Sequence, residues 1–407
     1  MGRLLVAISI AAALLLPRAA GAYEFDLSVD MRAVSSDATT TRLSGGLGKL
    51  RYDGEHDGAR LGYVRLGYRV DVTQTLRITA EGVAYGDHDV NPLDLTELFA
   101  DWRPIPSSAW RSRVKVGAFY PEISLENRMR GWRSPYTLSS SAINTWVGEE
   151  LRTIGAEYSL DWLGRSNGHA LDVTFNAALY GWNDPVGTVL ASRGWGLHDR
   201  QSTLLGRFAN RGQPLESRTV FYDDMDKRAG YYAGITANYR GLVEARVLHY
   251  DNRANVAAEV YKINDGAWLT RFESLGLRWT PTANWTVISQ WLHGRTFVDA
   301  NLPTNAWSFD AEFLLASLKQ GAMRYSMRYD RFATQQTASN FAQYIGGLYL
   351  GDRGHAWTIA GNRQINEHWN VALEAIDVRS NVAQRALIGE PDQASERQWQ
   401  LAVRYDR

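Results

Sequence analysis

The sequence predicts an all-β protein: a transmembrane antiparallel β-barrel of about 16 strands with long external loops. Three observations lead to this prediction. Segments of roughly ten residues alternate apolar and polar side chains along most of the chain. The polar face carries full charges at strand centres, and the apolar face is rich in Trp and Tyr near strand ends. The connections mostly alternate between short and long, as periplasmic turns and external loops do.

The composition excludes several other classes of protein. The 407 residues contain 44 Lys and Arg, 44 Asp and Glu, and no Cys. The zero formal charge argues against a nucleic-acid partner, and the lack of cysteine excludes disulfide frameworks and thiolate metal sites. Mean hydropathy is −0.33, and the chain has only one long apolar run, so a bundle of transmembrane helices is excluded. Length alone would allow two or three soluble domains, but the strand pattern argues against them.

The long apolar run opens the chain, and we expect residues 1–22 to form a secretory signal peptide. Arg3 gives the positive start, and the apolar core at 4–16 is too short for a spanning helix. Small residues up to Ala22 offer a cleavage site. A retained N-terminal anchor is the alternative. The mature barrel is therefore expected at 23–407.

The segment 323–330 shows the alternation most cleanly, with Met and Tyr on one face and Arg, Ser and Asp on the other. A soluble β-sandwich alternates too, but its strands are usually shorter and lack aromatic residues gathered near their ends. In lipid an open sheet would leave edge groups unpaired, so the sheet must close into a barrel. The expected strands lie near 24–34, 59–71, 75–86, 94–103, 112–120, 149–162, 169–180, 230–240, 242–250, 267–280, 285–297, 306–318, 321–333, 353–362, 369–379 and 397–405.

The strand count is even, which places both termini at the periplasmic end. Eighteen strands remain an alternative if 44–52 or 216–222 also joins the wall. The segment 267–280 is the least regular, because Arg271 and Glu273 share a face with apolar side chains, and a β-bulge there would reset the phase.

A barrel of this size encloses a water-filled lumen, so inward charges would line a channel. On the expected strand phases, basic and acidic side chains facing inward nearly balance, and the wall alone predicts no strong ion selectivity. The pore-lining residues expected from this pattern include Arg113, Lys115, Asp310, Glu312, Arg324 and Arg328.

The third external connection, 121–148, is rich in charge. Its charged residues are Glu122, Glu126, Arg128, Arg130 and Arg133. The spacing of the three arginines would allow their guanidinium groups to line one side of a pore constriction and attract anions or carboxylates. The alternative is a solvated surface loop with internal salt bridges.

Two segments resemble the porin superfamily, and in particular its phosphate-selective branch. In that branch a strand ending in an Arg-Pro turn leads to a Gly-x-Phe-x-x-Pro strand exit and a loop that bears Glu. Here 95–104 ends in Arg103-Pro104, and 114–127 contains Gly117-Ala118-Phe119-Tyr120-Pro121, which is one residue shorter. The resemblance implies a trimeric 16-stranded barrel whose third loop folds inward as the constriction. It does not extend to phosphate selectivity, because no run of inward lysines is present.

Other chemistry has weaker support. The acidic clusters at 53–57, 87–89 and 223–226 suit divalent cations, but solvated charge is the ordinary state of external loops. No Ser-His or Asp-His constellation with a supporting carboxylate marks a hydrolase. No enzyme activity, cofactor or metal is therefore expected.

We therefore expect a porin of the bacterial outer membrane, a passive diffusion channel for small hydrophilic solutes or ions with an anion preference at the loop arginines. The alternative is a non-conducting structural or ligand-binding barrel closed by the long loop 181–229. The expected partners are outer-membrane lipid and lipopolysaccharide, small solutes and two further copies of the chain.

Overall fold

A computed structural model describes residues 22–87, 93–209, 218–260, 265–298, 305–338 and 350–407. The expected signal peptide falls on residues 1–21, outside the described part of the chain. Among the described residues, no helix has the length and apolarity needed to cross a membrane.

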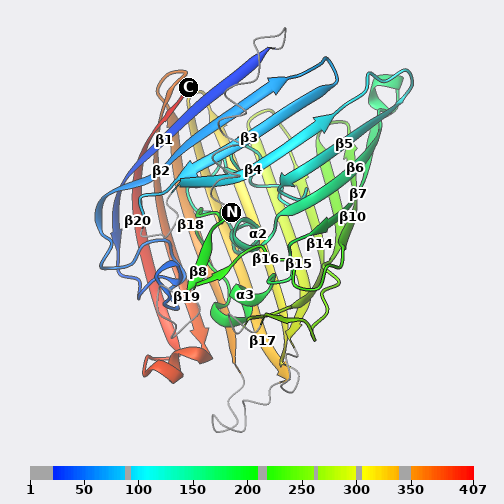
Figure 1. Cartoon of the computed structure of the whole chain (residues 1–407). Helices are drawn as coiled ribbons and strands as arrows, with labels where there is room; N and C mark the ends of the chain where they lie inside the picture. The colour runs from blue at the N-terminus through cyan, green and yellow to red at the C-terminus, as the bar shows by residue number, and fades with distance from the viewer. Residues whose placement is uncertain (1–21, 88–92, 210–217, 261–264, 299–304, 339–349) are drawn as a thin grey trace.

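The described strands close into one antiparallel barrel of sixteen, which confirms the predicted fold (Figure 1). Strands β1 and β20 close the barrel, with Ser28 opposite Asp406. The barrel strands are β1 (Tyr23–Ser36), β2 (Gly58–Asp71), β3 (Leu76–Ala84), β4 (Leu93–Trp102), β5 (Trp110–Phe119), β6 (Thr153–Trp162), β7 (Leu171–Gly181), β10 (Gly230–Tyr239), β11 (Val243–Asp251), β14 (Leu269–Trp279), β15 (Trp285–Val298), β16 (Asn305–Gln320), β17 (Met323–Ala338), β18 (Gly351–Gln364), β19 (Trp369–Val382) and β20 (Gln393–Asp406).

The eighteen-strand alternative is wrong. The short strands β8 (Arg207–Ala209) and β9 (Arg218–Val220) pair only with each other, as do β12 (Glu259–Val260) and β13 (Asp265–Gly266). The segment 44–52 contributes no strand to the wall.

Two local expectations also need correction. β14 pairs with both neighbours without a register shift, so the bulge proposed for 267–280 is wrong. Arg271 and Glu273 simply stand on the outer face, above the leucines of the same strand. β6 begins at Thr153 rather than near 149, because the preceding residues belong to a helix.

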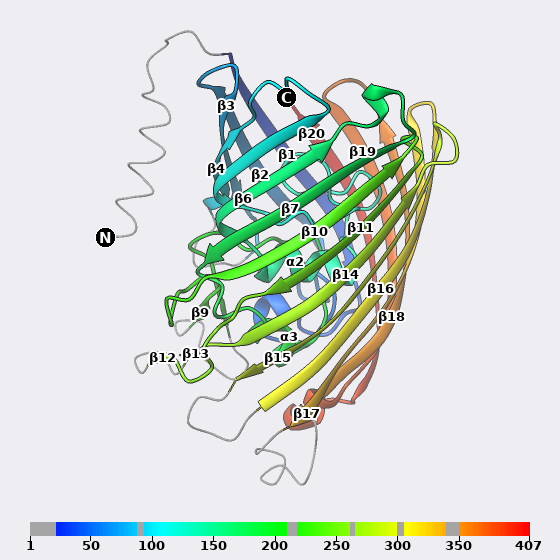
Figure 2. The same cartoon turned by 90° about the vertical axis from the view of Figure 1, so that its right-hand side faces the viewer.

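Three long connections at the extracellular end turn back into the barrel rather than outward. They are 37–57, 120–152 and the described residues of 182–229, of which the last two carry helices α2 (Ala142–Glu150) and α3 (Thr188–Arg193). Figures 1 and 2 show both helices within the ring of strands.

The apolar core of the molecule lies inside the lumen. The Trp146 ring on α2 contacts Phe309 of β16, Phe272 of β14 and Trp195, with ring centroids 5.2, 5.3 and 5.9 Å apart. Leu197 completes this cluster and is fully buried. The extracellular part of the lumen is therefore filled by side chains packed as in the core of a soluble protein.

Candidate permeation path through the lumen

The loop 120–152 crosses the lumen from one wall to the opposite one. Arg128 forms a bidentate ion pair with Glu244 of β11, in which one N–O distance is 2.8 Å. Arg130 pairs with Glu24 of β1 at 2.9 Å. Because β11 and β1 lie on opposite sides of the closed strand order, neighbouring arginines of one loop brace it against both sides.

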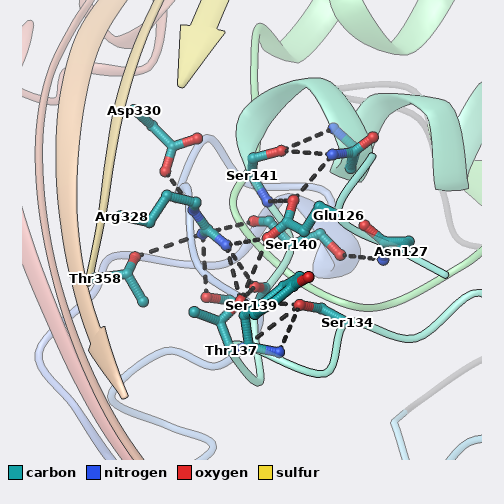
Figure 3. A network of polar contacts seen from close by, with 12 residues as sticks. Glu126, Asn127, Ser134, Thr137, Ser139, Ser140, Ser141, Arg328, Asp330 and Thr358 are labelled. Carbon is teal, nitrogen blue, oxygen red and sulfur yellow. Dashed lines mark hydrogen bonds and ion pairs between the residues drawn. The ribbon is translucent and has the colours of Figure 1, made fainter. Parts of the chain in front are cut away.

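A buried ion pair fixes the middle of this loop to the wall (Figure 3). Arg328 of β17 donates to Glu126 at 2.6 Å and to Asp330 at 2.7 Å. It also donates to the carbonyl oxygens of Ser139 and Ser140 at 2.8 and 2.9 Å. Arg328 and Glu126 have no exposed side-chain surface, so this pair holds the loop instead of meeting solute.

Carboxylates of the wall also accept hydrogen bonds from backbone amides of the loop. Glu374 of β19 accepts hydrogen bonds from the backbone amides of Leu138 and Ser139. Asp330 accepts one from the amide of Ala142 at 3.0 Å, which places its negative charge at the N-terminus of α2. The loop is therefore held by β17 and β19 along its length.

Glu150, the last residue of α2, joins the two lumen helices. Its carboxylate accepts the backbone amides of Gly187, Val189 and Leu190 at 3.0–3.2 Å, around the start of α3. It also accepts the Trp146 indole N–H at 2.6 Å. Burial raises the pKa of Glu150 to about 7, although these hydrogen bonds favour the charged form. One titratable group thus connects the two helices that fill the extracellular part of the lumen.

Glu122 lies at the start of the same loop among basic side chains of the wall. Its carboxylate is 3.0 Å from Lys115 Nζ and within 4.0 Å of Arg113 and Arg246. The Glu122 side chain is 42 % exposed. The wall residues Arg113 and Lys115, predicted to face inward, do so here and surround a loop carboxylate.

Arg133 lies where the crossing loop meets β1 and β20. Its guanidinium donates to Asp406 and to the Ser28 hydroxyl, both at 2.9 Å, and to the Tyr63 hydroxyl at 3.2 Å. Arg404 of β20 lies nearby and pairs with Asp30. The three loop arginines consequently form no single cluster: each one has a separate carboxylate partner.

Asp199, a residue that the strand pattern does not reveal, lines the small middle cavity of the lumen and is held by two arginines. Asp199 pairs with Arg32 of β1 and, at 3.0 Å, with Arg51. Burial alone would raise the pKa of Asp199, but these two guanidinium groups hold it well below its usual range. The Arg51–Asp199 pair ties loop 37–57 to loop 182–229, and Arg51 also reaches Asp87, after β3, at 2.9 Å.

Three cavities follow this charged region from the periplasmic end toward the outside. A vestibule of about 460 Å³ opens beside Arg324 and Arg404. A middle cavity of about 20 Å³, the space of a single water molecule, shares Arg133, Ser134 and Arg404 with the vestibule. An outer cavity of about 50 Å³ shares Gln201 with the middle one. The three cavities thus follow one another through the lumen, each sharing lining residues with the next.

Two predicted pore-lining residues face the other way. On β16 the aromatic side chains, including Phe309 and Phe313, are buried toward the lumen core, while Asp310 and Glu312 point outward. Glu312 is 48 % exposed and pairs with the equally outward Arg331 of β17. The prediction for Asp310 and Glu312 is wrong because the lumen beside β16 is filled with apolar side chains, which the aromatic face contacts.

Described acidic residues of the clusters proposed above for cations are held by backbone amides and neighbouring side chains, whereas residues 88 and 89 lie outside the described part of the chain. Carboxylate oxygens of Asp184, Asp224 and Asp226 lie within 4.8 Å of one another. Asp184 accepts the Met225 amide at 2.5 Å, and burial raises its pKa to about 6. Asp223 is not part of this group, so the predicted cluster is only partly assembled.

Comparison with known proteins shows the fold. No protein-family model and no curated protein matches the chain. Among solved structures, the chain is similar to the outer-membrane channel DcaP of Acinetobacter baumannii, with a TM-score of 0.54 and 11 % identity over 96 % of this chain and 99 % of that one.

Two further porins share the architecture. The OmpF of Salmonella typhi, solved with daunomycin, gives a TM-score of 0.52 and 11 % identity over 95 % of this chain and 97 % of that one. The anion-selective porin of Comamonas acidovorans gives a TM-score of 0.51 and 12 % identity over 95 % of this chain and 100 % of that one. The phosphate-selective branch suggested by the sequence is not confirmed. The chain has the architecture of outer-membrane porins and is a protein of the bacterial outer membrane.

Proposed function

We propose that this protein is a passive channel for small hydrophilic solutes, with a preference for anions. The observation that carries the proposal is the charge along the route through the lumen. The three cavities are lined by eight basic side chains and four acidic ones. They are Arg65, Arg133, Arg193, Arg200, Arg207, Lys319, Arg324 and Arg404, against Asp87, Glu149, Asp199 and Asp406.

The narrow middle cavity limits the size of the solute. A space of about 20 Å³ beside Arg133 and Arg404 admits water, so a larger solute requires the crossing loop or residues 199–201 to move. Guanidinium groups at such a point attract anions strongly, because little water is present to screen them. We therefore expect low conductance with brief closures rather than a wide, steady pore.

Single-channel recording in a planar bilayer tests both parts of the proposal. Purified full-length protein is expected to give conductance steps, and a KCl gradient is expected to give a reversal potential of anion-selective sign. A cation-selective sign would contradict the anion preference alone. An absence of steps from protein that shows heat-modifiable migration on a gel would contradict the channel itself.

The second candidate is a non-conducting barrel closed by its own loops. The fully buried Trp195 and Leu197 favour it, because they place loop 182–229 inside the wall cluster. The two candidates differ in whether conductance appears before or only after that loop is removed.

We also infer a homotrimer from the resemblance to porins. The outer faces of β3 and β4 support it, because they present small or apolar residues such as Ala80, Ala100 and Leu98. Mass determination of the detergent-solubilised chain by light scattering would measure the number of copies.

A further inference from the structure

The outer surface of the barrel carries a group of basic side chains near its extracellular end. They are Arg331 of β17, Arg353 and His355 of β18, and Arg379 of β19, named here the outer arginine patch. These residues line an open hollow of about 670 Å³ on the face turned away from the lumen. No acidic side chain is among the residues that line this hollow.

The pairing of the strands places three residues of the patch in one row and Arg353 beside that row. His355 lies directly opposite Arg331 on one side and Arg379 on the other. Arg353 lies two residues further along β18, on the same face as His355. Because neighbouring strands are about 4.8 Å apart, the side chains of one row can contact a single small anionic group.

The counter-charges lie at the edges of the patch. Arg331 pairs with Glu312 at 3.3 Å, and Arg379 approaches Asp377 at 3.8 Å. The Arg331 and Arg379 side chains are 68 and 66 % exposed. Within the described residues Arg353 has no carboxylate within 4.0 Å. The hollow therefore keeps a net positive charge that is open to a ligand.

Aromatic and apolar side chains lie directly toward the periplasmic side of the patch. Tyr329 and Trp357 form the next row, with ring centroids 4.7 Å apart. Ile359 and Leu373, further along, are more than half exposed on the outer face. Aromatic rings of this kind mark the boundary between lipid headgroups and acyl chains.

The position of the patch along the strands agrees with this boundary. On β19 the outward Trp369 lies at the periplasmic end, and Asp377 lies eight residues further on. That distance is about 26 Å along the strand, or near 20 Å along the membrane normal at usual barrel tilts. The patch thus lies at the outer edge of the apolar band.

We propose that the outer arginine patch binds the phosphate groups of an outer-leaflet glycolipid headgroup. Guanidinium groups form short bidentate hydrogen bonds with phosphate oxygens, and His355 in the same row offers a further donor. The acyl chains of the lipid would lie along Trp357, Ile359 and Leu373. The lipid, rather than free phosphate, is the proposed ligand because the outer arginine patch and the apolar strip are continuous.

Native mass spectrometry of the full-length protein in detergent tests this site. The protein is titrated with bis-phosphorylated lipid A, and in parallel with the same lipid after removal of both phosphates. The test variant is R353Q/R379Q, which retains size and hydrogen bonding. The control is R271Q/R295Q, which removes two outward arginines at the same end of β14 and β15, outside the hollow.

We expect the R353Q/R379Q pair to reduce bound lipid A by about fivefold or more, and R271Q/R295Q to change it by less than about twofold. The dephosphorylated lipid should bind wild type as weakly as the phosphorylated lipid binds R353Q/R379Q. Equal loss in both variants, or equal binding of both lipids, would overturn the site. Displacement of the lipid by excess inorganic phosphate would overturn its lipid identity. Channel activity does not enter these outcomes, and heat-modifiable migration checks that each variant is folded.

Discussion

Two groups of ion pairs made by the crossing loop 120–152 differ sharply in how they use charge. In the packed group, Arg328 and Glu126 are fully buried and hold the loop in place. In the exposed group, Arg130 and Glu122 are 53 and 42 % exposed and pair with Glu24 and Lys115. Residues of the same chemical types thus hold the loop where it is packed and form a solvated surface where it is exposed.

This contrast decides which substitutions should matter. Ion pairs in the packed group lack solvent screening, so a lost partner leaves a costly buried charge. The exposed ion pairs of the loop are screened within about 8 Å at physiological salt and contribute little to stability. The largest effects are expected where the lumen is packed.

Deleting 195–206 and joining the ends with a short Gly-Ser linker should have the largest effect. The deletion removes Trp195, Leu197 and Asp199, which help to fill the extracellular part of the lumen. Single-channel conductance should rise severalfold. Conductance in the deletion with none in wild type would favour the non-conducting barrel, and unchanged conductance would show that this segment does not limit the path.

Arg328→Met should release the crossing loop, because it leaves Glu126 and Asp330 buried without their partner. Breaking such a pair costs about 3–5 kcal/mol. The midpoint of heat-modifiable gel migration should fall, and channel noise should increase. Arg331→Met is the matched control three residues along the same strand, since its side chain is 68 % exposed. Equal effects of the two variants would contradict the anchor.

The junction of α2 and α3 should weaken as pH rises. The pKa of Glu150 is raised from 4.5 to about 7, so its contribution is full below about pH 4.5 and is lost as pH approaches and passes 7. The upper limit of this effect is about 3 kcal/mol. We expect more frequent channel openings at pH 8 than at pH 5.

Glu150→Gln is the control for that prediction. The amide keeps one acceptor oxygen for the α3 amides but does not titrate between pH 5 and 8. The variant should show openings that no longer depend on pH over this range. A pH dependence that persists in the variant would place its origin in another group.

The smallest effect is expected at the more exposed arginines of the crossing loop, Arg128 and Arg130. Arg128→Gln with Arg130→Gln should lower the anion-to-cation permeability ratio by about twofold or less at physiological salt, and by more at low salt. Reversal potentials measured at two ionic strengths check this. A larger change than that produced by Arg133→Gln would contradict the ranking, because Arg133 lines the narrow cavity.

The strand order and closure were predictable from the sequence because a barrel strand repeats every two residues. The alternation on β17, with Tyr325 and Met327 outward and Arg328 inward, was assigned correctly. The same period contains no information about which face is inside. On β16 the aromatic face was assigned to lipid, whereas Phe309 packs on Trp146 of the lumen helix.

The loop contacts could not be predicted from pattern alone. Asp199 and Arg51 are brought together from separate connections, and Glu150 meets the start of α3. None of these three residues lies on an alternating strand. The loop arginines were identified as functional candidates, but their partners lie on strands far away in sequence. Predicting such contacts would require pairs of residues that vary together among related sequences, since the chemistry of a single residue does not show what it contacts.

The anchoring of loop 120–152 on the last strands has a consequence for biogenesis. Its contacts reach Arg328, Glu374 and finally Asp406, next to the last residue of the chain. These contacts join residues 200 or more positions apart, and closing such long loops slows folding. A nascent chain truncated before β17 would lack every one of these partners. The crossing loop can therefore reach its final position only when the C-terminal strands are in place, which makes its docking a late step in assembly.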